Sequence, residues 1–263
     1  MKYTVIPILA AVMMMFLVGC GKKQDRSKIL RLHAGAGLQK PIDAVIEAFK
    51  QTEAGADITF ERNYLGSAQV MAQAEKDSLA DLFLPGDIFY INQLEKKGVI
   101  ESKTVVGYFI PVILVKKGNK KGIASLKDLF RSDVKVGLGD PRSCQVGRLS
   151  RAIFKKNNLP EDGPDTKNVQ HSLDVPTLGI WVETETVDAA IVWDTIGANT
   201  AGKTEMIAIP AEDNKISTPA IALLKSSPNK ALAKKFIEFI TSDAGKAVLQ
   251  NHNLRTDEPE GMD

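Results

Sequence analysis

The stretch VKVGLGDPRSCQVGRLSRAIFKKNNL, residues Val134 to Leu159, reads as one strand, one turn and one helix. Residues 134–140 predict the strand and residues 146–159 predict the helix, with glycine, proline and serine in the turn between them. A strand followed directly by a helix is the repeating unit of α/β proteins. The turn also holds Cys144, which could be a nucleophile, a metal ligand, half of a disulfide or a small loop residue.

The same strand–helix unit recurs on both sides of this stretch. Further strands are predicted at 29–34, 56–64, 80–86, 108–118, 188–194, 205–211 and 217–227, and further helices at 39–54, 67–78, 87–99, 125–130, 177–187 and 229–252. Strict alternation of this kind predicts an α/β fold with largely parallel sheets and helices on both faces.

Two long apolar strands, Tyr108 to Val115 and Thr218 to Leu224, each follow a complete set of α/β units. This order suits two Rossmann-like lobes joined by two crossing hinge strands, with the C-terminal helices returning to the first lobe. We therefore predict lobe 1 at residues 29–110 plus 218–254 and lobe 2 at residues 111–217. The acidic segment 255–263, which contains proline and glycine, is predicted to be a disordered tail.

The N-terminus has the pattern of an export signal. Lys2 precedes seventeen uncharged residues, Tyr3 to Gly19, and the end of this run with the next residue, Leu17-Val18-Gly19-Cys20, resembles a bacterial lipobox. We expect residues 1–19 to be a lipoprotein signal peptide, Cys20 to be lipidated and residues 20–28 to be a polar tether. An ordinary signal or a membrane anchor is the alternative, although an anchor normally needs about 20 apolar residues.

The composition excludes several classes of function. A formal net charge of +2, with no basic block interleaved with aromatic residues, argues against nucleic acid as a partner. If Cys20 is acylated, Cys144 is left alone, which argues against a structural disulfide. The three histidines show no metal-ligand spacing, so no direct cation site and no cofactor are expected. The common hydrolase, nucleotide-binding and zinc-protease motifs are absent from the sequence.

Four predicted helices share one feature, which is a start rich in small or turn-forming residues. These starts are HAGAG at 33–37, LGS at 65–67, GDPRSCQVG at 139–147 and SLDVPT at 172–177. Each leaves main-chain N–H groups free at the positive end of a helix dipole. If the four starts converge in one cleft, they form an anion site that needs no cationic side chain. Taken singly, each is an ordinary α/β turn.

At this point the sequence resembles a known family, the periplasmic molybdate/tungstate-binding proteins of ABC transporters, which have the type II periplasmic-binding-protein fold. The resemblance runs from about Leu30 to Leu254. It is carried by HAGAGLQKPIDAVIEAFK, LGSAQVMAQ, ADLFLPGD, VKKGNKKGIASLKDL, VGLGDPRSCQVGR and DAAIVWDTIG. In that family a tetrahedral oxyanion lies between the lobes, held by hydroxyls and main-chain N–H groups.

The resemblance implies a set of ligand-binding positions in this chain. The family's first serine falls on Gly37, so only main-chain donors from Ala36 and Gly37 remain there, and the second serine matches Ser67. Further main-chain donors fall at Val146, beside Gly147, and at Val175. The family's tyrosine falls on Trp193, whose indole N–H can donate but cannot accept.

Three more residues are placed beside the expected site. His33 leads into the first loop and could donate to the anion, although such a residue more often ends a strand and bonds main chain. Arg148 could attract the anion, although an arginine at such a position more often pairs with a nearby carboxylate on the surface. Cys144 is expected to be a small loop residue at or beside the pocket.

Together with the N-terminal signal, the resemblance implies a monomeric, lipid-anchored, extracytoplasmic binding protein that passes molybdate or tungstate to an ABC transporter permease. It is not expected to be an enzyme. A binder of another small anion on the same fold, such as sulfate, phosphate or a carboxylate, is the nearest alternative. An enzyme that uses Cys144 as a nucleophile is the alternative from another class, and it would need a base within hydrogen-bond reach.

Overall fold

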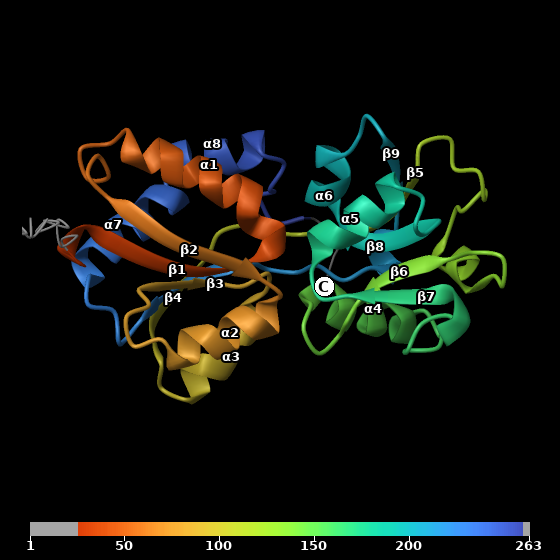
Figure 1. The fold of residues 1–263 in the computed structure, drawn as a ribbon, viewed down its shortest axis with the longest axis horizontal. Coiled ribbons are helices and arrows are strands. Elements are labelled where there is room, and N and C mark those ends of the chain that lie inside the picture. The colour runs from red at the N-terminus through yellow and green to blue at the C-terminus, as the bar shows by residue number, and fades with distance from the viewer. Residues whose placement is uncertain (1–25, 260–263) are drawn as a thin grey trace, which may run out of the picture.

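The computed structural model describes residues 26–259 and places two lobes side by side, each built on a five-stranded sheet (Figure 1). The predicted signal peptide 1–19, Cys20, the tether up to residue 25 and the end of the tail at 260–263 lie outside the described residues. Arg26–Lys28, the last part of the predicted tether, forms a short 3-10 helix (η1).

The sheet of lobe 1 has the strand order β2-β1-β3-β10-β4. Strand β1 is parallel to β2 and β3, whereas β10 is antiparallel to β3 and β4. The strands are β1 (Ile29–Gly35), β2 (Thr59–Leu65), β3 (Leu82–Leu84), β4 (Ile100–Val105) and β10 (Ala220–Leu224).

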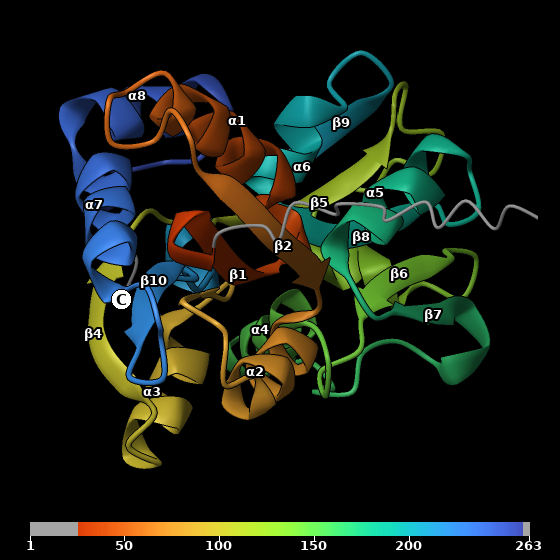
Figure 2. The same cartoon turned by 60° about the vertical axis from the view of Figure 1, so that its left-hand side comes forward.

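Helices cover both faces of this sheet, as Figure 2 shows, with α1 and α8 on one face and α2 and α3 on the other. Alternating side chains of a strand serve the two faces, so Leu82 and Leu84 pack in one hydrophobic cluster and Phe83 in another. The helices are η2 (Ala36–Leu38), α1 (Gln39–Lys50), α2 (Ser67–Lys76), α3 (Ile88–Lys96), α7 (Lys230–Thr241) and α8 (Asp243–Asn251).

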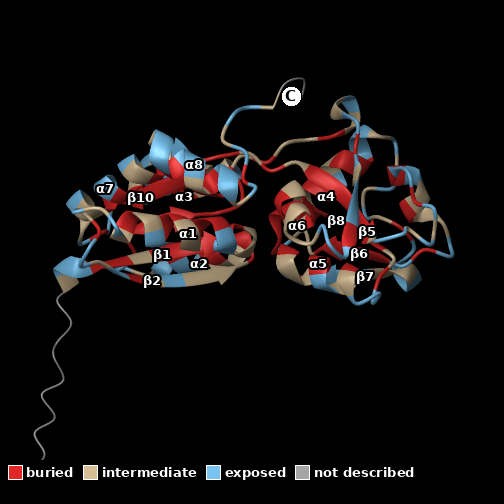
Figure 3. Cartoon of the chain, turned by 90° about the horizontal axis from the view of Figure 1, so that it is seen from above, coloured by how far each residue is buried: buried red, intermediate tan, exposed pale blue. Residues whose placement is uncertain are grey.

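The sheet of lobe 2 has the order β7-β6-β8-β5-β9. Strand β6 is parallel to β7 and β8, and β5 is antiparallel to β8 and β9. Its strands are β5 (Pro111–Lys116), β6 (Val136–Gly139), β7 (Val169–Ser172), β8 (Ala189–Trp193) and β9 (Thr204–Ala208). In both lobes the buried residues concentrate in the strands and on the helix faces that meet them (Figure 3).

The helices of lobe 2 also cover both faces, with α5 and α6 on one side of the sheet and α4 on the other (Figure 1). They are α4 (Gln145–Lys156), α5 (Val175–Glu183), α6 (Asp194–Asn199) and the short 3-10 helices η3 (Leu126–Phe130), η4 (Thr166–Asn168) and η5 (Ala211–Asp213). None of the helices within residues 26–259 is long and apolar enough to span a bilayer.

Two segments of the chain cross between the lobes and pair with each other. The amide of Phe109 donates to the carbonyl of Ser217 at 2.8 Å, and the amide of Ser217 donates back to Phe109 at 3.0 Å. The predicted α/β fold of two lobes joined by two crossing segments is therefore confirmed. The long strand expected from Tyr108 is shorter, because Tyr108 and Phe109 belong to this crossing and β5 begins at Pro111.

The expectation of largely parallel sheets is wrong, since both sheets are mixed. Strands β5 and β10 directly follow the crossings, and each runs antiparallel to its neighbours. The sequence prediction also missed β4, β7 and α6. Strands β4 (IESKTV) and β7 (VQHS) are exposed edge strands without an apolar run, and α6 has only 6 residues.

The tail predicted to be disordered from residue 255 is held at its first residue. The amide of Tyr108 donates to the carbonyl of Arg255 at 2.8 Å, and the guanidinium of Arg255 lies 3.9 Å from the carboxylate of Asp194. Arg255, the first residue of the predicted tail, therefore pairs with the crossing segment.

Candidate functional site

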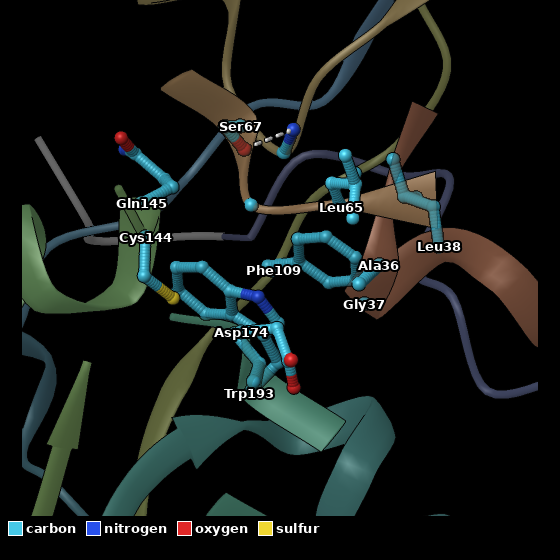
Figure 4. A pocket seen from close by; sticks show the side chains of 14 residues that line it. Ala36, Gly37, Leu38, Leu65, Ser67, Phe109, Cys144, Gln145, Asp174 and Trp193 are labelled. Atoms are coloured by element: carbon cyan, nitrogen blue, oxygen red, sulfur yellow. Dashed lines mark hydrogen bonds between the residues drawn. The ribbon is translucent and has the colours of Figure 1, made fainter. Parts of the chain in front are cut away.

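A small cavity lies between the lobes, where the carboxyl ends of parallel strands from both sheets face each other (Figure 4). Its volume is about 20 Å³, whereas a single water molecule needs about 10–15 Å³. A cavity of this size suits a compact solute. Crevices at the carboxyl ends of strands are the usual ligand sites of α/β sheets.

The lobe 1 wall is built from the loop Gly35–Leu38 and the start of α2. Ser67 is the first residue of α2, and its Oγ accepts a hydrogen bond of 3.1 Å from the amide of Gly86. The hydroxyl proton of Ser67 thus stays available for a solute. Ala36 and Gly37 begin η2, where main-chain N–H groups have no partner within the helix.

The lobe 2 wall is built from the starts of α4 and α5. Cys144 is the N-cap of α4 and Gln145 its first residue. At α5 the side chain of Asp174 accepts a 2.9 Å bond from the amide of Thr177, which leaves the amide of Val175 at the helix end next to the cavity. Donors of both lobes thus face one small space.

Val146 and Gly147 do not line the cavity. The amide of Gly147 donates to the carbonyl of Cys144 at 3.1 Å, and a Cβ on Gly147 would meet the carbonyl oxygen of Gly139 at 2.1 Å. Glycine is needed there for close packing of α4 on β6. Of this loop, Cys144 and Gln145 line the cavity, one residue before the predicted donor Val146.

Trp193, at the end of β8, closes the floor between the lobes. Its ring stacks on Phe109 of the crossing segment, with centroids 5.1 Å apart and planes 7° apart. Trp193 is 2% exposed, and no described residue accepts a hydrogen bond from its indole N–H. That N–H is a fixed donor at the cavity wall, beside Gly37 (Figure 4).

No lysine, arginine or histidine lines the cavity in the part of the chain that the structure describes. The positive potential in the cavity must come from the helix N-termini that lie at its wall, since the N-terminus of a helix carries about half a unit of positive charge. This arrangement binds small anions by donors rather than by ion pairs. Across residues 26–259, no group of three or more His, Cys, Asp or Glu side chains is arranged to hold a metal ion.

Cys144 is a buried free thiol that lines the cavity (Figure 4). Burial raises the pKa of this thiol to about 12, although the amides of Gly147 and Val146 favour the thiolate. A thiol that stays protonated at neutral pH is a poor nucleophile.

The other two residues predicted to lie beside the site, His33 and Arg148, do not line the cavity. His33 Nε2 lies 3.0 Å from the carboxylate of Asp77, and its Nδ1 is buried without a hydrogen-bond partner among the described residues. Arg148 reaches from α4 toward α3 of lobe 1. The nearby carboxylates Asp81 and Asp87 have structural partners: Asp81 accepts from Ser227 and Asp87 caps α3.

Main-chain contacts close the cavity on the side of α2. The amide of Ala68 in lobe 1 donates to the carbonyl of Ser143 in lobe 2 at 3.1 Å. A Cβ on Gly66 would lie 2.5 Å from the carbonyl oxygen of Leu173 and 2.7 Å from Ser143 Oγ. The lobes are therefore in direct contact here, and only glycine fits between them.

The sequence and the fold of this chain are similar to those of known proteins. The model of the bacterial extracellular solute-binding protein family matches residues 30–255. The chain belongs to this family. A molybdate-binding protein from Mycobacterium bovis is 27% identical to this solute-binding protein over 252 residues, which cover 92% of this chain and 94% of that one.

Solved structures share the fold of this solute-binding protein. The sulfate-binding protein SubI from Mycobacterium tuberculosis has a TM-score of 0.78 at 20% identity and covers 89% of this chain and 88% of its own. The molybdate-binding protein from Azotobacter vinelandii has a TM-score of 0.72 at 13% identity, and the match covers 87% of this chain and 100% of that one. Identities this low establish the fold alone.

Family membership confirms the resemblance found in the sequence and the two-lobed periplasmic-binding fold. The family is one of solute-binding proteins, and the curated relative named above is a molybdate-binding protein. Five of the predicted site residues of this solute-binding protein meet at the cavity, namely Ala36, Gly37, Ser67, Val175 and Trp193. Cys144 also lines the cavity, as expected. The lining residues that were not predicted as ligand contacts are Gly35, Leu38, Leu65, Gly66, Gly86, Phe109, Gln145 and Asp174. Phe109 carried no local signal because it lies in the hinge.

Proposed function

We propose that this solute-binding protein captures a small tetrahedral oxyanion, molybdate or tungstate, in the cavity between its lobes and delivers it to an ABC transporter permease. The single observation that carries the proposal is the cavity itself, which is small and surrounded by helix starts. Its donors come from both lobes, so an anion in the cavity holds the lobes together. The relative that binds molybdate supports the choice of anion.

The proposed ligand contacts come from both walls. On lobe 1 they are the main-chain donors of Ala36 and Gly37 and the hydroxyl of Ser67. On lobe 2 they are the amides of Gln145 and Val175 and the indole N–H of Trp193. Hydrogen bonds to a charged acceptor contribute about 1.5–3 kcal/mol each, so a dianion can be held without a cationic side chain.

Sulfate is the second candidate, because it has the same shape and charge and a sulfate-binding protein shares this fold. Isothermal titration of the purified protein with molybdate, tungstate, sulfate and phosphate separates the candidates. We expect submicromolar binding of molybdate or tungstate and at least tenfold weaker binding of sulfate, since about 1.4 kcal/mol changes affinity tenfold. Heat with sulfate or phosphate alone would overturn the choice of anion.

We also propose that Cys20 anchors the mature protein to a bacterial membrane outside the cytoplasm. The lipobox-like end of the N-terminal apolar run supports this. Metabolic labelling with a radioactive fatty acid should mark the wild-type protein in its host and leave Cys20→Ala unmarked. Label in both proteins, or in neither, would contradict the anchor.

A further inference from the structure

Arg148 makes a contact between the lobes that lies outside the cavity. It belongs to the first turn of α4 in lobe 2, and its guanidinium carbon lies 4.0 Å from the centroid of the Phe89 ring in lobe 1. Its Nη2 lies 3.9 Å from the carboxylate of Asp87, also in lobe 1. One arginine thus stacks on an aromatic face and faces a carboxylate across the interlobe gap.

A chain of hydrogen bonds ties this contact to the hinge and to the cavity wall. Arg148 Nε donates to the side chain of Gln145 at 3.0 Å, and the Gln145 amide group donates to Ser217 Oγ at 3.2 Å. Ser217 lies in a crossing segment, and its hydroxyl donates to Asp87 at 2.7 Å. The ring of contacts returns to Arg148 through Asp87.

The lobe 1 side of this ring is rigid. Asp87 accepts from the amides of Phe89 at 2.8 Å and Thr218 at 3.1 Å, and its side chain is 11% exposed. The carboxylate is therefore fixed on lobe 1 and on the crossing segment. Arg148 sits on α4, which moves with lobe 2 whenever the lobes separate.

We propose that Arg148, Phe89 and Asp87 form a latch that stabilises the closed arrangement of the lobes and thereby slows release of the bound anion. Arg148 is a positioning residue in this proposal, since it does not line the cavity. The latch rests on the proposed function, because it presumes that an anion is held between closed lobes. A contact present only in the closed state raises affinity for any ligand that needs closure.

The alternative role for Arg148 is long-range attraction of the anion. Attraction acts on the association rate and is screened by salt, whereas a contact made after closure acts on the dissociation rate. Phe89 separates the two roles, since it is uncharged. Phe89→Leu removes the stacking surface and leaves every charge in place, and Phe89 is 36% exposed, so its loss is tolerated by the core.

Stopped-flow fluorescence with molybdate tests the latch, with Arg148→Gln, Phe89→Leu and the double variant. Arg151→Gln is the matched control, because Arg151 is on the same helix but pairs with Glu161 and Asp162 in lobe 2. We expect dissociation to be about 3- to 30-fold faster in both single variants. The double variant should dissociate no faster than the faster of the two single variants. Arg151→Gln should dissociate at the wild-type rate.

Two results would overturn the latch. One is slower association of Arg148→Gln with unchanged dissociation, and the other is wild-type kinetics in Phe89→Leu. Thermal unfolding of each variant without anion shows that the fold is intact. If wild type binds none of the four anions in the titration, the proposed function fails; if wild type binds and the variants match it, only the latch fails.

Discussion

The indole of Trp193 fills the space that a side chain at residue 37 would need. A Cβ on Gly37 would lie 3.1 Å from Cδ1 and 3.3 Å from Nε1 of the indole. Trp193 cannot easily move away, because it stacks on Phe109 and is 2% exposed. The indole N–H therefore lies beside the position where the resemblance would place a serine hydroxyl, so we expect the two departures from the family pattern to be coupled.

Gly37→Ser should weaken anion binding by about 1–3 kcal/mol, because the added side chain overpacks the indole. Combined with Trp193→Tyr, which makes room, the same serine should recover most of that loss. Titration of the two single variants and the double variant measures the coupling. Additive effects of the two substitutions would contradict a shared space.

Gly66→Ala should weaken anion binding at least about tenfold, because its methyl group would press against main-chain oxygen in the closed lobes. The ligand-free protein can relieve that clash by opening, so its thermal stability should change little. Gly202→Ala is the matched control, since a Cβ there meets nothing within 4 Å. Small-angle scattering with saturating molybdate should show a larger radius for Gly66→Ala, and identical radii would argue against a closing glycine.

Ser67→Ala should lower affinity by about 1–3 kcal/mol, because it removes a donor to the anion and leaves the amide of Gly86 without its acceptor. Ser150→Ala is the control: this serine is also buried, but its hydroxyl donates to the carbonyl of Val146 away from the cavity. Isothermal titration of both variants checks the difference. Equal losses in the two variants would mean that the effect comes from stability and not from a ligand contact.

Cys144→Ser should retain anion binding, and iodoacetamide should label the wild-type thiol slowly at neutral pH. The folded state holds the thiol proton more tightly than the unfolded state, whose pKa is near 9, because burial raises the folded pKa to about 12. The stability this provides is complete below pH 9 and is lost as the pH rises through about 12.

Chemical unfolding of wild type and Cys144→Ser between pH 8 and pH 12 checks this dependence. Burial also raises the pKa of Tyr90 to about 12, so both proteins should lose stability at high pH, with wild type losing more. Fast labelling, or parallel stability curves for the two proteins, would show that the thiol is not held in its neutral form.

The helix starts show how much of the site can be predicted from short stretches of sequence. Small residues directly after a strand, as at residues 65–67 and 172–177, locate helix N-termini, and Ser67 and Val175 line the cavity as expected. The sequence could not decide which amide of 144–147 faces the cavity, because that depends on how α4 packs against Gly139. Close packing of α4 on β6 keeps Val146 and Gly147 off the cavity wall, which Cys144 and Gln145 line instead.

The amino-acid sequence by itself determined the α/β units and the positions of the helix starts, because hydrophobic periodicity and turn chemistry act within a few residues of each other. Only the tertiary structure decided the antiparallel β5 and β10, the shared space of Gly37 and Trp193, and the contact of Arg148 with Phe89. These relationships join residues far apart in the chain, and their geometry is set by the crossing segments that bring the two lobes together.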